Sequence, residues 1–140
     1  MIGKLNHVGI ATPSIEESWK LYRDLLGATS IGEKFSMPEQ GVWVCFVNLP
    51  NAQIELIEPY GDESPIHAFL AKNPRGGQHH VCFEVADILA ARDEMRAKGA
   101  TVLGAGEPRI GAHGVPVIFV HPKDMGGVLV ELMQTPTDAH

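Results

Sequence analysis

The fold of this chain is decided by a stretch that occurs twice, first as Leu5-Asn6-His7-Val8-Gly9-Ile10-Ala11 and again as Gln78-His79-His80-Val81-Cys82-Phe83-Glu84-Val85. Each copy has the pattern of a short strand that carries a histidine near its start, and His7 and His80 are 80 − 7 = 73 positions apart. Because internal repeats determine the architecture of a chain, the other landmarks of the two halves are best compared at this offset.

The landmarks that follow the two strands recur in the same order. Ser14 and Asp87, which are both favoured N-cap residues, precede two amphipathic stretches and are 87 − 14 = 73 positions apart. Both stretches end at Gly-Ala-Thr, at 27–29 and 99–101, where glycine can supply the left-handed backbone that ends a helix. The last two strands also match, 41–47 with 114–120 and then 52–56 with 128–132, where three extra residues lengthen the second turn.

Each half therefore has the order strand, helix and three strands, which is a βαβββ module of about 70 residues. Two such modules in tandem predict an α+β fold. We predict one domain at 1–140, made of modules at about 1–74 and 75–140, with their boundary in the turn Asn73-Pro74-Arg75-Gly76-Gly77.

The patterns of apolar and turn residues place the individual elements. Strands are predicted at 5–11, 29–35, 42–48, 53–58, 79–85, 101–103, 115–121 and 128–134. Helices are predicted at 14–26, from Pro65 onward and at 88–98, with loops at 36–41 and 104–114. The tail at 136–140 is expected to fray.

Composition excludes several classes of protein. A hydrophobic fraction of 44% and a charged fraction of 20% are ordinary for a globular protein, and the net charge of −6 argues against general binding to nucleic acid or anionic membranes. The residues before His7 are too few and too polar for a signal peptide, and no apolar run reaches the length of a membrane span. Cys45 and Cys82 lie in predicted strands and are expected to be reduced thiols, which favours a cytoplasmic location.

Strand parity gathers four polar side chains on one side of the predicted sheet. Side chains alternate across a strand, so the purely apolar sides are expected to pack on the helices and the other sides to line a shared concavity. That second side carries one histidine and one glutamate from each half, namely His7, Glu55, His80 and Glu131.

Two imidazoles and two carboxylates that converge are typical ligands of a divalent metal ion. Histidine with glutamate suits Co²⁺, Mn²⁺, Ni²⁺, Fe²⁺ or Zn²⁺, and coordination positions would remain open for water or substrate. A single histidine in a strand is more often a structural residue, and a single glutamate in a strand is usually at an exposed edge. Because the same two residue types recur at matching places in both halves, the sequence favours a metal site.

Three of the other histidines are predicted to be structural or exposed, namely His67, His79 and His121. His79 neighbours His80 but faces the opposite side of its strand. His113 differs because it lies in the glycine-rich loop Gly111-Ala112-His113-Gly114, where a ligand contact and simple exposure are both open.

Paired βαβββ modules with this histidine and glutamate pattern resemble the vicinal oxygen chelate superfamily, which is glyoxalase-like, and within it the chain is similar to the methylmalonyl-CoA epimerases. The resemblance covers nearly the whole chain. It rests most on the stretches 6–11, 54–59 with 62–66, 79–81, 111–114, and 121–123 with 126–132. It implies that the modules form a curved, half-open mixed sheet around a central metal site, with the helices outside.

The resemblance implies an isomerase that interconverts the R and S forms of methylmalonyl-CoA at carbon 2. The proton beside a thioester is weakly acidic, and a divalent cation, Co²⁺ foremost, that chelates the thioester and carboxylate oxygens would stabilise the enolate. Inversion needs a base on one face of the substrate and an acid on the other. The implied partner is a small-molecule acyl-CoA, and members of this family are usually homodimers.

The resemblance also implies roles for single residues, beginning with the four metal ligands named above. Glu131 is the first choice for proton transfer, with Glu55 related to it by the repeat. Some members carry a further glutamate after the Pro-Glu-Gln-Gly turn, where this chain has Val44, so the second acid or base must be Glu55 or an ordered water. His113 and Lys123 are candidates for contacts with the substrate.

Three alternatives share the predicted fold. A glyoxalase I-type lyase uses a similar set of histidines and glutamates and also moves a proton beside a carbonyl. An extradiol dioxygenase would use two histidines and one carboxylate around Fe²⁺, and Glu55 as a fourth ligand argues against it. A small-molecule-binding protein of the same superfamily would often lack a metal, so stoichiometric metal in the purified protein would count against it.

Overall fold

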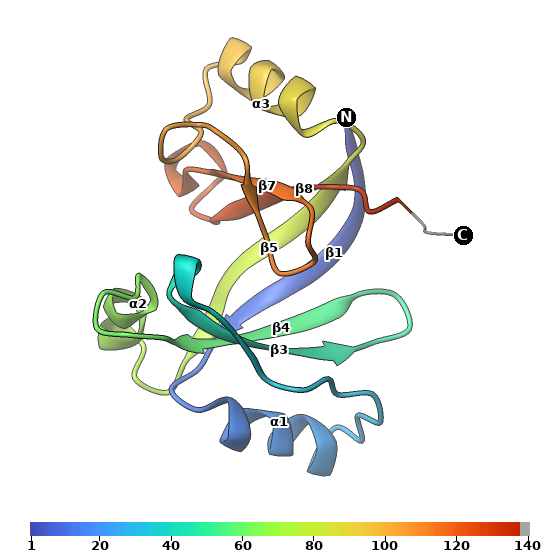
Figure 1. Cartoon of the computed structure of the whole chain (residues 1–140), viewed down its shortest axis with the longest axis vertical. Helices are drawn as coiled ribbons and strands as arrows, with labels where there is room; N and C mark the ends of the chain where they lie inside the picture. Colours follow the sequence, from blue (N-terminus) through green and yellow to red (C-terminus); the bar gives the residue numbers. More distant parts are fainter. Residues whose placement is uncertain (138–140) are drawn as a thin grey trace. The chain divides into compact units, whose positions relative to one another are not determined.

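Two compact units make up the computed structural model, which describes residues 1–137. The N-terminal unit is His7–His79, and the C-terminal unit is Met1–Asn6 together with the chain from His80 onward. Strand β1 (Ile2–Ala11) contributes to both, as the blue ribbon in Figure 1 shows. The tail at 136–140 was expected to fray, and its residues 138–140 lie outside the described residues.

The N-terminal unit contains the first βαβββ module. After β1 come α1 (Ile15–Asp24), β2 (Phe35–Met37), the 3₁₀ turn η1 (Pro38–Gln40), β3 (Val42–Asn48) and β4 (Gln53–Pro59), followed by the short helix α2 (Ile66–Lys72). The strand order is β2-β3-β4-β1. Strands β1 and β4 run parallel, whereas the other neighbours are antiparallel. The predicted hairpin at 42–48 and 53–58 is confirmed.

The C-terminal unit repeats this arrangement. Its elements are β5 (Gly77–Val85, the first three residues of which belong to the other unit), α3 (Ile88–Ala97), β6 (Arg109–Ile110), β7 (Pro116–Val120), the 3₁₀ turn η2 (Pro122–Asp124) and β8 (Val130–Gln134). The strand order is β5-β8-β7-β6, again with one parallel pair, β5 with β8. The predicted tandem of βαβββ modules is therefore confirmed.

The ends of the two long helices form as the sequence predicts. The Ser14 side chain accepts a hydrogen bond from the backbone N–H of Glu17, and the Asp87 carboxylate accepts two from the first turn of α3. Gly27 and Gly99 follow the helices with φ of 72° and 90°, a left-handed conformation that favours glycine. No helix in the described part of the chain is long and apolar enough to cross a membrane.

A second capping interaction at each helix joins residues far apart in the sequence. In the N-terminal unit, the backbone N–H of Ile15 donates to Oε1 of Glu58 at 2.8 Å. In the C-terminal unit, the backbone N–H of Ile88 donates to Oε1 of Gln134 at 3.2 Å. Because a helix leaves its first N–H groups without partners inside the helix, the last strand of each module helps to fix the start of its own helix.

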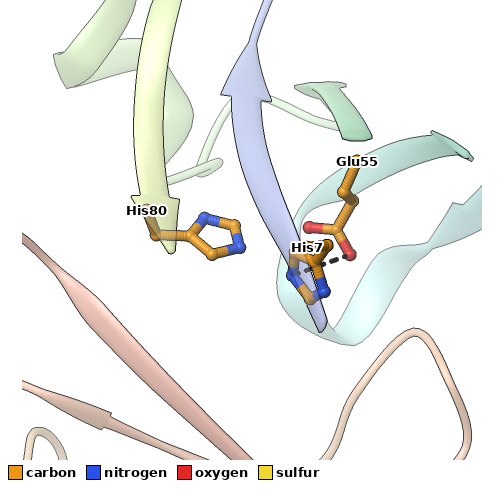
Figure 2. Close-up of side chains that lie close together, drawn as sticks. All are labelled: His7, Glu55 and His80. Atoms are coloured by element: carbon orange, nitrogen blue, oxygen red, sulfur yellow. Dashed lines mark ion pairs between the residues drawn. The ribbon is translucent and has the colours of Figure 1, made fainter. Parts of the chain in front are cut away.

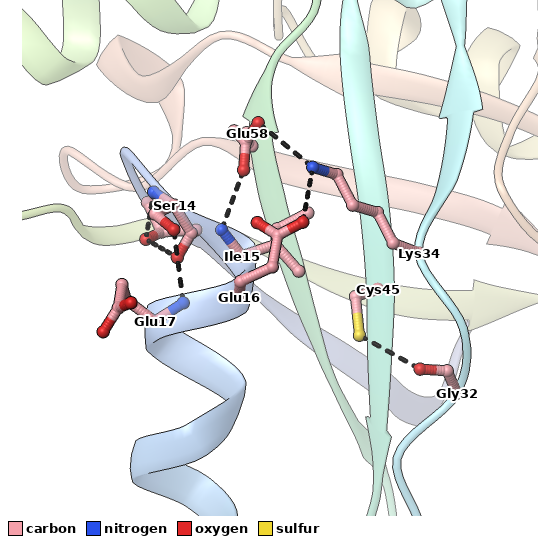
Figure 3. A network of polar contacts seen from close by, with 9 residues as sticks. Ser14, Ile15, Glu16, Glu17, Gly32, Lys34, Cys45 and Glu58 are labelled. Carbon is pink, nitrogen blue, oxygen red and sulfur yellow. Dashed lines mark hydrogen bonds and ion pairs between the residues drawn. The ribbon is translucent and has the colours of Figure 1, made fainter.

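Lys34 extends the first of these caps into the network drawn in Figure 3. Its Nζ lies 3.0 Å from Oε1 of Glu16 and 3.4 Å from Oε2 of Glu58. The hydrogen bond from Lys34 lowers the pKa of Glu16 below its ordinary value. Nearby, the Cys45 thiol donates to the carbonyl oxygen of Gly32 at 3.4 Å, and burial raises the pKa of this thiol.

Each helix covers the apolar face of its own strands. Helix α1 packs on β3 and β4, and α3 packs on β7 and β8, as Figure 1 shows for each unit. The buried cluster at α1 joins Ile15 of the helix to Cys45, Val47 and Leu56 of the strands. The buried cluster at α3 joins two helix residues, Ile88 and Ala91, to Val85, Val102, Ile118, Val120, Val130 and Leu132. These are the strand faces that parity assigned to the helices.

Two predicted strands are wrong in position or extent. Residues 29–34 form no regular strand and contribute one isolated bridge, Ile31 with Val47, whereas β2 begins at Phe35 and continues to Met37, inside the loop predicted at 36–41. Likewise 101–103 contributes one bridge, Val102 with Val120, and β6 forms inside the predicted loop at 104–114. In both modules the segment after the helix is too irregular for strand periodicity to locate it.

Candidate metal centre

The N-terminal unit brings His7 and Glu55 together. The two residues lie on the parallel strands β1 and β4, where His7 is in register with Gln53, two positions before Glu55 on the same face. Nε2 of His7 lies 3.7 Å from Oε2 of Glu55, the ion pair dashed in Figure 2. Both are buried, with exposed fractions of 1% and 7%.

The C-terminal unit holds the equivalent pair, His80 and Glu131. Strands β5 and β8 are parallel, with Cys82 in register with Glu131, so His80 and Glu131 share one face. Nε2 of His80 lies 3.2 Å from Oε1 of Glu131. These two residues are also buried, with exposed fractions of 5% and 6%. Each half of the repeat thus carries one buried pair of a histidine and a glutamate.

The chemistry of these donors fits a divalent cation. Imidazole nitrogen and carboxylate oxygen are the ligand types that ions from Mn²⁺ to Zn²⁺ accept, and the described residues include buried groups of this kind that could hold a metal. Buried carboxylates need a compensating positive charge or hydrogen bonds. A cation beside them would supply the charge. The internal repeat predicts that the two pairs share a single ion, and this stays a prediction.

The glycine-rich loop after β6 lies against the Glu131 carboxylate. Gly111 is buried, and a Cβ atom built on it would be 3.7 Å from Oε2 of Glu131 and only 2.9 Å from a methyl group of Val117. The backbone can therefore approach this closely only because residue 111 lacks a side chain. His113 lies in the same loop and is half-buried, so its predicted contact with a ligand stays a prediction.

The other predicted positions are on the surface or in structural contacts. Lys123 lies in η2 with an exposed side chain, and its backbone N–H donates to Nδ1 of His121 at 3.0 Å. His121 is therefore a turn residue, as predicted. His79 packs edge-on against Phe69 with ring centroids 5.3 Å apart, and exposed His67 contacts a backbone carbonyl, so the interpretation of both as structural or exposed residues is confirmed.

Comparison with known proteins identifies the family. Residues 6–119 match the model of the Glyoxalase/Bleomycin resistance protein/Dioxygenase superfamily. The ethylmalonyl-CoA/methylmalonyl-CoA epimerase of Cereibacter sphaeroides is 58% identical over 96% of this chain and 99% of that protein. The mitochondrial methylmalonyl-CoA epimerase of Homo sapiens is 52% identical over 95% of this chain and 74% of that protein. The chain belongs to the methylmalonyl-CoA epimerase family.

The fold agrees with a solved structure from this epimerase family. A methylmalonyl-CoA epimerase in complex with methylmalonyl-CoA and NH4+ superposes with a TM-score of 0.89 at 32% identity, covering 98% of this chain and 97% of that one. The resemblance inferred from the paired modules and their histidines and glutamates is therefore confirmed at the level of fold and family.

Val44 is almost fully buried in β3, opposite Ile57 of β4, and lies on the same face as Phe46. Phe46 in turn is opposite Glu55. An apolar side chain thus lies on this face at the position where the resemblance described above implies a glutamate in some members of the family.

Sequence reasoning did not single out three residues that contact the histidines or glutamates. Phe46 lies beside His7, Phe119 lies beside His80, and Gly111 lies beside Glu131. The two phenylalanines occupy matching places of the repeat, at 119 − 46 = 73, which is the offset of the two histidines. That coincidence was a usable signal, whereas the close approach of Gly111 has no counterpart in the sequence pattern.

Proposed function

We propose that this chain interconverts (R)- and (S)-methylmalonyl-CoA. The observation that carries this proposal is that curated relatives 51–58% identical over 94–96% of the chain are all methylmalonyl-CoA epimerases. The buried histidine and glutamate pairs give this identity a chemical basis, because the reaction needs groups that can accept and return a proton in a site shielded from water.

His7, Glu55, His80 and Glu131 would hold one divalent metal ion, with Co²⁺ as the first choice and Mn²⁺, Ni²⁺ or Zn²⁺ as alternatives. When bound, such an ion supplies a Lewis acid next to the oxygen atoms of the substrate. The two pairs support this proposal because they repeat the same residue types on equivalent strands. Metal binding requires the histidines to be neutral and the glutamates ionised, so metal affinity should fall at low pH.

Glu131 and Glu55 carry the proposed proton transfers. The Glu131 carboxylate takes the proton from carbon 2, and the electron pair of that bond moves into the thioester carbonyl to give an enolate. A proton then returns to carbon 2 on the opposite face, from an ordered water or from Glu55 when its carboxyl group is protonated and not bound to the ion, and Glu131 passes the abstracted proton to solvent. In the reverse direction the two roles exchange. Val44 offers no carboxylate for the second transfer, whereas Glu55 lies on the neighbouring strand two residues from Ile57, the partner of Val44.

The acyl-CoA partner would contact the surface near the C-terminal unit's glycine-rich loop. His113 lies two residues from Gly111, which borders Glu131, and this position in the chain supports a proposed contact between its imidazole and the acyl group. Lys123 is exposed on η2 and carries a positive charge suited to a coenzyme A phosphate. Ethylmalonyl-CoA is a second candidate substrate, because the Cereibacter relative that is 58% identical acts on both acyl groups by its name.

The oligomeric state and the cellular compartment are also part of the proposal. We propose a homodimer in the cytoplasm, with one domain of modules at 1–74 and 75–140. Both cysteines are buried as free thiols, which suits a reducing compartment. Analytical ultracentrifugation would test the dimer, and a sedimentation coefficient of a monomer at micromolar concentration would contradict it.

The decisive experiment is proton–deuterium exchange at carbon 2 of methylmalonyl-CoA in heavy water. Wild type with Co²⁺, wild type with chelator, and Glu131→Gln with Co²⁺ form the three arms. We expect rapid exchange only in the first. Glu94→Gln is a matched control, since Glu94 pairs with Lys98 on the solvent-facing side of α3 and the variant should exchange like wild type.

The outcomes separate the alternatives. Absence of exchange with every metal would contradict the epimerase. Conversion of a hemithioacetal would then favour a glyoxalase I-type lyase, and tight binding of a small molecule without stoichiometric metal would favour a binding protein. Equal exchange in wild type and Glu131→Gln would contradict the role of Glu131 while leaving the overall activity intact.

A further inference from the structure

Each of the two buried histidines forms an edge-to-face ring contact with a phenylalanine in its own unit. The ring centroids of His7 and Phe46 are 6.5 Å apart at an interplanar angle of 69°, and those of His80 and Phe119 are 5.9 Å apart at 80°. Both are edge-to-face geometries within the range in which aromatic rings attract each other. The contact therefore occurs twice, with similar geometry.

Strand register explains why the contact repeats. Phe46 is directly opposite Glu55 on the antiparallel pair β3 and β4, and Phe119 is directly opposite Glu131 on β7 and β8. Residues directly opposite on antiparallel strands point to the same face of a sheet. In each unit, three neighbouring strands thus present a histidine, a glutamate and a phenylalanine on one face.

We infer that Phe46 and Phe119 are positioning residues that hold the imidazoles of His7 and His80 in the orientation for metal binding. The inference rests on the proposed metal site. The χ2 angle of histidine has broad minima, so an imidazole on a strand can turn unless a neighbour blocks it. The glutamate on the adjacent strand and the phenylalanine on the strand beyond it limit that rotation. Groups around a metal ligand that fix its ring orientation commonly strengthen metal binding.

The two phenylalanines are themselves held in place. Phe46 packs against Phe35 of β2, with ring centroids 6.1 Å apart. Phe119 packs on a small cluster made by Cys82, Val117 and Met133, which lies on the face of β5 that also carries His80. Rings that are fixed by their own neighbours can restrain a histidine, whereas freely rotating rings could not.

The test compares Phe46→Leu and Phe119→Leu with Phe69→Leu. The control removes a ring that packs edge-on against a histidine in the same way, at 5.3 Å and 74°, but that histidine is His79, which faces away from the proposed site. Leucine keeps an apolar side chain of similar size at each position. Titration calorimetry with Co²⁺ alone measures the dissociation constant, and the melting temperature of the metal-free protein measures the packing contribution.

We expect Phe46→Leu and Phe119→Leu each to raise the Co²⁺ dissociation constant about tenfold, and the double variant about a hundredfold. Phe69→Leu should stay within about twofold of wild type while its metal-free melting temperature also falls. Phe46→Tyr and Phe119→Tyr keep the ring and should restore near wild-type affinity. If a leucine variant does not fold, the tyrosine variants still test the inference. A tyrosine variant that binds Co²⁺ as weakly as a variant lacking one metal ligand would contradict ring positioning.

Two results would overturn the inference, and they are distinguishable. If wild type binds Co²⁺ and the two leucine variants bind it as tightly as the Phe69→Leu control, the rings only pack and the inference alone fails. If wild type itself binds no Co²⁺ or other divalent ion, the proposed metal site fails and the inference fails with it.

Discussion

The carboxylate of Glu131 lies 3.2 Å from the imidazole Nε2 of His80, on a strand that runs parallel beside it. The contact places a proton-accepting group and a candidate metal ligand next to each other in a buried setting. The neighbouring residue, His79, faces the opposite side of the strand and packs on Phe69. This pair of adjacent histidines provides a sharp test of which one binds metal.

We expect His80→Gln to lower the affinity for Co²⁺ by at least about a hundredfold, because it removes a ligand and leaves the buried Glu131 carboxylate without its partner. Metal content after dialysis, measured by atomic emission, checks this. His79→Gln is the matched control and should keep full metal content. Equal metal content in both variants would refute a role for His80.

We expect Gly111→Ala to destabilise the protein by about 1–3 kcal/mol and to lower epimerase activity. The added Cβ would meet Val117 at 2.9 Å and would press the loop away from the Glu131 carboxylate. Urea unfolding and the rate of epimerisation are the measurements. Gly32→Ala is the control, since its Cβ would be 3.6 Å from the nearest atom, an ordinary contact. Wild-type activity in Gly111→Ala would show that the loop need not lie so close.

We expect Glu58→Ala to destabilise the N-terminal unit by about 0.5–2 kcal/mol, because the first N–H of α1 loses its acceptor. Glu58→Gln keeps an acceptor oxygen but loses the ion pair with Lys34, so its effect should be smaller. Chemical denaturation of the metal-free protein compares the two. If Gln and Ala were equally destabilising, the ion pair and not the cap would be the source of the effect.

The stability contributed by Asp124 should depend on pH. Its carboxylate accepts a hydrogen bond from the backbone N–H of Thr101 at 2.9 Å, and this bond lowers the pKa of Asp124 below its ordinary value of 3.8. Because the pKa of Asp124 is lower in the folded state, its carboxylate stabilises the fold fully at pH values above its ordinary pKa. This stabilisation is lost as the pH falls through the pKa of the folded state.

Asp124→Asn should therefore be less stable than wild type at neutral pH, and the difference should shrink as the medium is acidified below about pH 4. Denaturation curves at several pH values measure it. Asp62→Asn, at an exposed position after β4, should match wild type throughout. A difference for Asp124→Asn that does not change with pH would argue against the carboxylate as its cause.

Most of the fold was predictable because the repeat aligns several independent signals. Ser14 and Asp87 start the helices, and Gly27 and Gly99 end them, in agreement with simple capping rules. The segment at 29–35 was predicted wrongly because Ser30, Ile31 and Gly32 bond to β3 without forming a regular strand, an arrangement that depends on tertiary packing and not on alternation of side chains.

The site was predictable only in part. Alternation along a strand shows which residues share a face, so each histidine could be assigned to the side of its glutamate. Phenylalanine in a strand is typical of any core, so Phe46 and Phe119 gave no functional signal by themselves. The approach of Gly111 to Glu131 depends on how a loop folds back, and no sequence pattern specifies that path.

Glu58 and Gln134 lie three residues beyond Glu55 and Glu131 on the same strands, and they tie those strands to the starts of α1 and α3. Each of these side chains therefore holds the start of a helix to the strand that carries the glutamate. The second half has three more residues in the turn before that strand, yet both halves keep this hydrogen bond. A turn of different length is thus compatible with the same link between helix and strand.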